Sequence, residues 1–159
     1  MREARSYPGQ YSTAGDAAVE GLFGGMIAGI AMAVYLMLAG LTFGQGPLDL
    51  LNSFGGNGGS TPLVGLLLHL GVSGVYGIVF ALICRLTARR MGLKPALWLV
   101  GLSGGIYGSL LWILAQTILL PATSSPLTAI PSGHFLLAHL IFGISLGTLT
   151  NRERSQIDL

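Results

Sequence analysis

Two histidines stand within otherwise apolar stretches, and their residue type makes them the first candidates for chemistry. His69 lies in "LLLHL" at 66–70, and His139 lies in "LLAHL" at 136–140. An ionisable side chain is costly to bury in a membrane, so one that occurs there is a candidate functional group. Two neutral imidazoles on facing helices are able to ligate the iron of a haem or the magnesium of a chlorophyll.

The same two side chains also have a structural explanation. Each can make a hydrogen bond across helices to Ser, Thr, Tyr or a backbone carbonyl, which contributes about 0.6 kcal/mol on average and fixes helix register. Ser73 and Tyr76 follow His69 at spacings of four and seven, which places them on one helix face. We favour this polar tie between helices, with cofactor ligation and a role in ion or proton passage as alternatives.

Other reactive groups are few. Glu20 lies at the edge of an apolar segment, where it can cap a helix, and Asp49 and His134 lie near segment ends. The single cysteine, Cys84, excludes an intramolecular disulfide and a thiol cluster. The sequence has no phosphate-binding loop with Lys, no His-Glu helix pair for zinc and no nucleophile elbow. We therefore expect no enzymatic activity, no catalytic residues and no metal site.

The elements that must position the histidines are membrane-spanning helices. Of the 159 residues, 52% are hydrophobic and only 9% are charged, against roughly a quarter charged in soluble domains. A spanning helix needs about 20 mainly apolar residues, and four windows meet that need: 20–43, 63–84, 95–120 and 134–150. The prediction is an all-α bundle of four transmembrane helices over 20–150, with an N-terminal segment 1–19 and a tail 151–159.

The basic residues predict an orientation. They precede the first span, join the second and third spans within 85–94, and follow the fourth span as Arg152 and Arg154. By the positive-inside rule these parts are cytoplasmic, so we expect a protein of a bacterial inner membrane with both termini on the cytoplasmic side. The polar opening lacks the pattern of a signal peptide and is expected to be retained. Since lipid headgroups are the nearest anions, we expect the lipid bilayer as a partner and no nucleic acid.

Two halves of the chain resemble each other. "GLFGGMIAG" (21–29) and "GLSGGIYGS" (101–109) share their glycine pattern, and each half also has an outer loop and an "HL" pair. We interpret this as a duplicated helical hairpin whose copies run in the same direction. The first outer loop contains "PLDLLNSF" (47–54), for which we predict a short surface helix with Leu48, Leu51 and Phe54 on one face. The second, "PATSSPLTAIPSG" (121–133), contains Pro121, Pro126 and Pro131 and is expected not to continue a helix.

Glycines should hold the helices together, because hydrocarbon supplies no hydrophobic drive for helix association and close packing depends on small residues spaced four apart. That spacing occurs at Ser73 and Gly77, at Gly104 and Gly108, and at Gly21, Gly25, Gly29, Gly101, Gly105, Gly143 and Gly147. We expect a tightly packed bundle, with the last seven of these glycines as the principal contacts.

Four stretches carry a family resemblance: "GLFGGMIAGIA", "HLGVSGVYGIVFALICRL", "LWLVGLSGGIYGSLLWILAQTILLP" and "GHFLLAHLIFGISLGTLTNRERS". Over about residues 20–154 the chain resembles the YagU-type group of bacterial four-span inner-membrane proteins. The resemblance implies the four-helix fold and supplies no catalytic residues to transfer.

Few chemical groups, glycine-lined faces and small extramembrane parts favour an accessory or structural subunit of a larger membrane complex, such as a respiratory or photosynthetic assembly. Other membrane subunits are then the expected partners. One alternative is a haem- or chlorophyll-binding electron-transfer or pigment protein that uses His69 and His139 as axial ligands. A further alternative is a small-molecule or ion transporter that works as an oligomer.

Overall fold

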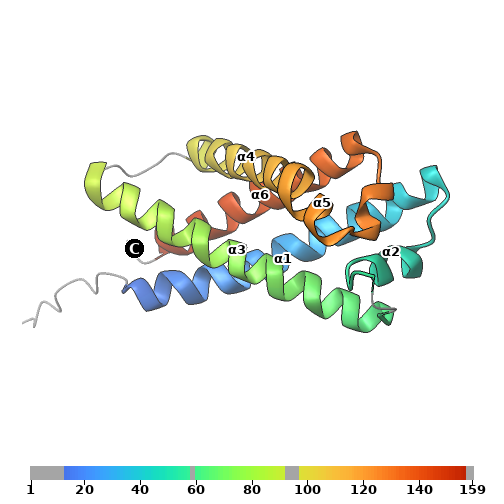
Figure 1. The fold of residues 1–159 in the computed structure, drawn as a ribbon. Helices are drawn as coiled ribbons and strands as arrows, with labels where there is room; N and C mark the ends of the chain where they lie inside the picture. Colours follow the sequence, from blue (N-terminus) through green and yellow to red (C-terminus); the bar gives the residue numbers. More distant parts are fainter. Residues whose placement is uncertain (1–12, 58–59, 92–96, 157–159) are drawn as a thin grey trace, which may run out of the picture.

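The computed structural model describes residues 13–57, 60–91 and 97–156, and every regular element in these ranges is helical. Six α-helices and three shorter turns follow one another (Figure 1). The helices are α1 (Ala14–Gly40), α2 (Pro47–Ser53), α3 (Pro62–Met91), α4 (Leu97–Leu114), α5 (Leu120–Thr123) and α6 (Ser132–Gln156). The turns are η1 (Leu41–Phe43), the π-helical η2 (Ala115–Leu119) and η3 (Pro126–Ala129).

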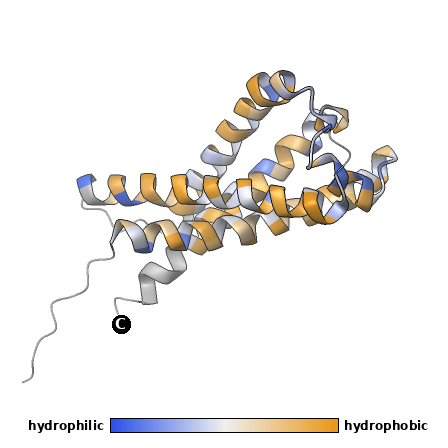
Figure 2. Cartoon of the chain, turned by 60° about the horizontal axis from the view of Figure 1, so that its bottom comes forward, coloured by the Kyte–Doolittle hydropathy of each residue, from blue (hydrophilic) through white to orange (hydrophobic). Residues whose placement is uncertain are grey.

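Among the described residues, four helical stretches are long and apolar enough to cross a membrane: Ala14–Phe43, Pro62–Ala88, Leu99–Thr123 and Ser132–Thr150. Figure 2 shows hydrophobic residues along the lengths of the long helices, with hydrophilic residues mainly toward their ends. This pattern is typical of a multi-pass membrane protein, as the sequence predicts. Helix α1 begins and α6 ends at the same end of the bundle, and α2 lies at the opposite end (Figure 1).

Helix α1 begins earlier than the sequence predicts, because residues 13–16 form a capping box. The hydroxyl of Thr13 accepts a hydrogen bond from the backbone N–H of Asp16, and the Asp16 carboxylate accepts the N–H of Thr13. The buried Arg85 of α3 donates to the carbonyl of Thr13. Several of the predicted cytoplasmic charges, Arg2, Arg5 and Lys94, lie outside the described residues.

Glycines bring α1 and α3 into direct backbone contact. A Cβ atom built on Gly25 would lie 2.3 Å from the carbonyl oxygen of Ser73, and one built on Gly77 would lie 2.0 Å from that of Gly21. A Cβ on Gly29 would lie 2.5 Å from the Ser73 hydroxyl oxygen. No side chain fits at these distances, so the predicted packing role of Gly21, Gly25 and Gly29 is confirmed.

Helices α4 and α6 pack in the same way, but through a different pair of α4 glycines from the pair that we expected to dominate. A Cβ on Gly104 would lie 2.1 Å from the carbonyl oxygen of Gly143, and one on Gly147 would lie 2.5 Å from that of Val100. Gly108 makes an equally close approach, 2.2 Å, to the carbonyl oxygen of His139. Gly143 and Gly147 are therefore packing residues, as predicted.

The prediction was wrong for Gly101 and Gly105 as contacts within the bundle. A Cβ on Gly101 would have no atom within 4 Å, and one on Gly105 would make only ordinary contact with Ile144 at 3.7 Å. The physical reason is that α1 packs against both α3 and α6, whereas α4 packs closely against α6 only. In α1 the neighbouring glycines serve two interfaces, while in α4 one of the two glycine rows faces outward.

The bundle is closed on one side and held open on the other. Helices α1 and α6 pack together, with the fully buried Leu36 and Leu146 in one core cluster. The backbones of α3 and α4 do not pack closely. Their gap is bridged by Tyr107, whose hydroxyl donates to the carbonyl oxygen of Tyr76 at 2.9 Å.

Helix α2 covers the end of the bundle opposite the start of α1 (Figure 1). The predicted helix at 47–54 is confirmed as α2, with Pro47 in its first turn. Its side toward the bundle is set by Leu50, which is fully buried, whereas Leu48 of the predicted apolar face is 64% exposed. Helix α2 packs against α1 and α3 and does not use Leu48 for that contact.

The expectation that the 121–133 loop does not continue the helix was wrong at its start, because α5 extends to Thr123. The helical path of α4 continues through η2 into α5, where Pro121 occupies the first turn. Proline is tolerated there because the wider π turn precedes it and a first-turn residue needs no intrahelical N–H bond. Ser124, with φ 48°, adopts the left-handed conformation that ends α5.

Candidate functional site

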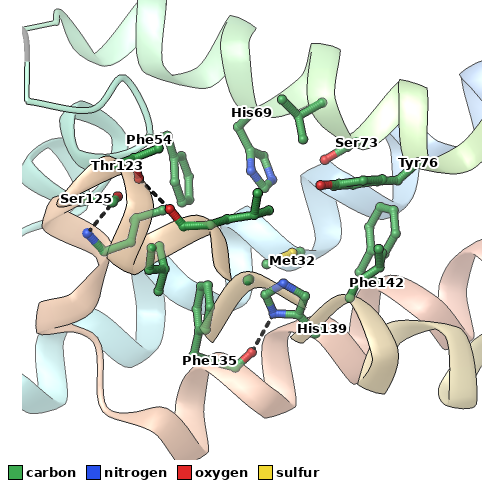
Figure 3. A pocket seen from close by; sticks show the side chains of 16 residues that line it. Met32, Phe54, His69, Ser73, Tyr76, Thr123, Ser125, Phe135, His139 and Phe142 are labelled. Atoms are coloured by element: carbon green, nitrogen blue, oxygen red, sulfur yellow. Dashed lines mark hydrogen bonds between the residues drawn. The ribbon is translucent and has the colours of Figure 1, made fainter. Parts of the chain in front are cut away.

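A cavity of about 220 Å³, open on one side, lies between α1, α3, α4, α6 and the η2–α5 segment. Aromatic and apolar side chains form most of its wall, with His69, Ser73, Tyr76, Thr123, Ser125 and His139 as polar groups. Figure 3 shows both imidazoles directed into this space, His69 from α3 and His139 from α6. The structure thus brings together the two histidines that the sequence singles out.

His69 connects two helices. Its Nε2 lies 3.0 Å from the carbonyl oxygen of Gly29 in α1, and its ring stacks on Phe54 with centroids 4.3 Å apart and planes 16° apart. The close approach of Gly29 to α3 is what brings this carbonyl within reach. For His69 the predicted polar tie between helices is confirmed.

His139 makes its hydrogen bond within its own helix. Its Nδ1 lies 2.8 Å from the carbonyl oxygen of Phe135, one turn earlier in α6, and its ring meets Phe135 edge to face at 4.5 Å. The predicted tie between helices was wrong for this hydrogen bond, because the buried imidazole projects into the cavity and not against a neighbouring backbone.

The two carbonyl partners decide which ring nitrogen carries the proton. A carbonyl oxygen only accepts hydrogen bonds, so in the neutral imidazoles Nε2 of His69 and Nδ1 of His139 are the protonated nitrogens. The second nitrogen of each ring, Nδ1 of His69 and Nε2 of His139, is then an acceptor with a lone pair. The cavity therefore contains two fixed imidazole acceptors.

The cavity opens sideways, between α3 and the η2–α5 segment. Most of its lining residues are buried or half-buried, but Val72, Leu119 and Thr123 are exposed. Val72 is 53% exposed and Leu119 is 39% exposed, and both are apolar residues within spanning helices. The mouth therefore faces the lipid rather than water.

Two polar contacts bound this mouth. The Tyr107–Tyr76 hydrogen bond bridges α3 and α4. At the α2 end, the side-chain amide of Asn57 donates to the carbonyl oxygen of Ser124 at 2.7 Å and to that of Thr123 at 3.4 Å. This second contact joins the loop after α2 to the end of α5.

Several residues of the cavity wall have no direct signal in the sequence. Phe54 was assigned to a surface helix, and Met32 lies in a stretch that reads only as apolar. The π turn at Ala115–Leu119 was also missed, although π turns frequently occur at functional sites. Pro121, two residues after this turn, is the signal in the sequence that the regular helix is interrupted.

The cavity fits a smaller molecule than the cofactors considered above. Pockets for drug-sized ligands have volumes of roughly 300–1,000 Å³, and a tetrapyrrole is at least as large as such ligands, whereas the cavity measures about 220 Å³. The two histidines supply suitable ligands, but the space does not accommodate a haem or a chlorophyll. Within the described residues, no group of three or more His, Cys, Asp or Glu side chains is placed to hold a metal ion.

The third histidine lies outside the cavity. His134 of α6 forms a 2.9 Å hydrogen bond between its Nδ1 and the Tyr35 hydroxyl of α1, and its ring lies near Phe43. It therefore stabilises the closed side of the bundle and provides a natural control for the other two histidines. Asp49 is exposed on α2 and does not line the cavity.

No protein-family model, curated protein or solved structure matches this chain. The YagU-type resemblance stays a prediction.

Proposed function

We propose that this protein is a membrane-embedded binding protein that takes up a small lipid-soluble molecule in the cavity of His69 and His139. The observation that carries the proposal is the pairing of a mainly apolar cavity with two fixed imidazole acceptors inside one bundle. Ligand pockets typically combine apolar walls with a few oriented polar groups in this way. The proposal belongs to the small-molecule class of the alternatives raised by the sequence and requires no oligomer.

The shape of the bundle supports storage or passage of a ligand rather than simple packing. A bundle that served only as a scaffold would gain by closing the α3–α4 gap, since van der Waals contact is the main attraction between helices in lipid. Here Tyr107 spans that gap with a side-chain hydrogen bond, and the backbones stay apart. The α3–α4 side therefore lacks the close helix packing that the α1–α6 side has.

The binding test is native mass spectrometry of the protein purified gently from its membrane. Ala115→Phe places a ring in the cavity wall, and we expect it to lose any small molecule that the wild type carries. Ala122→Phe is the matched control, since Ala122 is exposed and does not line the cavity. Equal occupancy in both variants, with unfolding temperatures like the wild type, would contradict the proposal.

The accessory-subunit function remains a second candidate, and a separate surface favours it. An open apolar groove of about 600 Å³ lies along α4 and α6, with Gly101, Gly105 and Ser109 on the α4 side. Small residues of this kind let a neighbouring helix approach closely, so a transmembrane helix of a partner subunit fits this groove. Gly105→Leu should then remove a stoichiometric partner from the purified complex while leaving ligand occupancy unchanged.

A further inference from the structure

We infer that the ligand of this cavity is an amphiphile with a hydroxyl-bearing aromatic head and an apolar tail, and that it enters sideways from the lipid between α3 and α5. This inference rests on the proposed binding function and adds the chemical class of the ligand and its route. The class follows from hydrogen-bond polarity, ring contacts and the position of the mouth.

Hydrogen-bond polarity selects a donor. The Gly29 and Phe135 carbonyl oxygens occupy the N–H groups of His69 and His139, so each imidazole offers only an acceptor to a ligand. A hydroxyl group can satisfy such an acceptor, whereas an ether or ester oxygen places lone pair against lone pair. The two imidazoles therefore favour an alcohol or phenol over its methyl ether, whereas the hydroxyls of Ser73 and Tyr76 can donate to either oxygen and do not discriminate.

The wall selects an aromatic head. Phe54, Phe135, Phe142 and Tyr76 all line the cavity, and the labelled rings surround the same space in Figure 3. Aromatic pairs gain about 0.5–1.5 kcal/mol beyond area burial when stacked or set edge to face. Phe54 and Phe135 already make these two kinds of contact with the histidines, so a flat ring between the imidazoles continues an existing arrangement.

The position of the cavity mouth accounts for the apolar tail of the ligand and for its entry from the lipid. The exposed lining residues at the mouth include two apolar ones, Val72 and Leu119, and these lie in the lipid-facing part of spanning helices. A cavity of about 220 Å³ holds a head group but not a long chain. An apolar tail can stay in the bilayer through this opening while the head is bound, so the ligand never needs to cross water.

The experiment compares para-decylphenol with its methyl ether, using the purified wild-type protein in lipid nanodiscs. One net hydrogen bond to a histidine corresponds to as much as about 10-fold in affinity, so the phenol should bind about 10-fold more tightly. The double variant His69→Phe/His139→Phe keeps both rings but removes both acceptors, and the preference should fall to near onefold. His134→Phe is the matched control, because His134 lies outside the cavity and should leave the preference unchanged.

Entry is tested by association rates. Val72→Trp places a bulky ring at the mouth and should slow association of the phenol about 10-fold, whereas Val75→Trp, on an equally exposed part of α3 away from the cavity, should not. Equal rates in the two variants would overturn the sideways route.

The outcomes separate the inference from the function on which it rests. Equal affinity of the wild type for phenol and ether would overturn the donor class while the binding function stands. No binding of either probe, together with no ligand in the native protein, would remove both. If the double variant fails to fold, His69→Phe and His139→Phe are measured singly, and the preference should fall in the one whose imidazole accepts the hydroxyl. An unchanged preference in both would overturn the donor class.

Discussion

The α1–α3 and α4–α6 helix pairs are joined by the same kind of contact but differ at the end of the bundle that contains α2. In both pairs a glycine backbone lies directly against the facing helix, at Gly25 in one and at Gly104 in the other. Beyond this contact, the first pair is covered by α2 and tied by His69 to α1, whereas the second pair ends in a π turn. The two helix pairs therefore share one kind of glycine packing but differ in the segments that follow it.

The difference shows where the cavity comes from. His69 uses its hydrogen bond to hold two helices together, while His139 uses its own helix as partner and leaves its ring facing open space. The segment that lies across from them is interrupted at Ala115–Leu119, and this part of the chain forms one wall of the cavity. The α1–α3 pair is held together by a hydrogen bond between its helices, whereas the α4–α6 pair leaves the His139 ring free to line the cavity.

The largest expected effect tests whether the two glycine contacts are equivalent. Gly104→Ala and Gly25→Ala each force a Cβ to within 2.1 Å and 2.3 Å of a carbonyl oxygen, so each should lower the free energy of unfolding by about 3 kcal/mol. Gly105→Ala meets only a side chain at 3.7 Å and should be neutral or slightly stabilising. Unfolding titrations in mixed micelles measure these free energies. An unchanged free energy of unfolding for Gly104→Ala would show that the two glycine contacts are not equivalent.

A smaller effect separates the two histidines. His69→Phe removes a hydrogen bond between helices and should lower the free energy of unfolding by about 0.6–1.7 kcal/mol. His139→Phe removes a bond within one helix, whose carbonyl partner belongs to the helix ladder, so its cost should stay below about 0.5 kcal/mol. The same unfolding titration checks both. A larger loss of unfolding free energy for His139→Phe than for His69→Phe would show that His139, and not His69, holds the helices together.

Two tyrosines compare the open and closed sides. Tyr107→Phe removes the bridge between α3 and α4 and should cost about 0.6 kcal/mol while widening their separation. Tyr35→Phe removes the hydrogen bond to His134 on the closed side and should leave that separation unchanged, because α1 and α6 also pack directly. Spin labels at positions 75 and 106, with Cys84 replaced by Ser, report the distance. A wider α3–α4 separation in both variants would show that the direct packing of α1 against α6 does not by itself hold the bundle together.

The smallest effect concerns the loop contact at the α2 end. Asn57→Ala removes the amide that bonds to the carbonyl oxygens of Thr123 and Ser124, and it should cost about 0.5 kcal/mol because the contact is exposed. Hydrogen exchange should rise in the loops on both sides of this contact and stay unchanged in α1. Ser53→Ala, which removes a hydroxyl bonded only to its own helix, is the control. Protected loops in Asn57→Ala would mean that the two ends are joined by other contacts.

Much of the architecture could be predicted from local pattern alone. Four long apolar segments, the short helix that begins at Pro47 and the close approach of Gly21, Gly25 and Gly29 all follow from residue type and spacing. These features depend on the bilayer as solvent and on the absence of a side chain at glycine, which are visible in the sequence. The partner and orientation assignments stay predictions, since they depend on molecules and charges beyond the bundle.

Residue type and spacing are enough to predict that two histidines lie within spanning helices and that small residues bring those helices together. The packing of the helices sets the rest: His69 bonds across to Gly29 while His139 bonds to Phe135, and Gly104 rather than Gly105 lies against the backbone of α6. The physical reason is that the neighbours of a helix face depend on its rotation and on how many helices surround it. A repeated motif therefore repeats its residues, but not the surroundings that give those residues their roles.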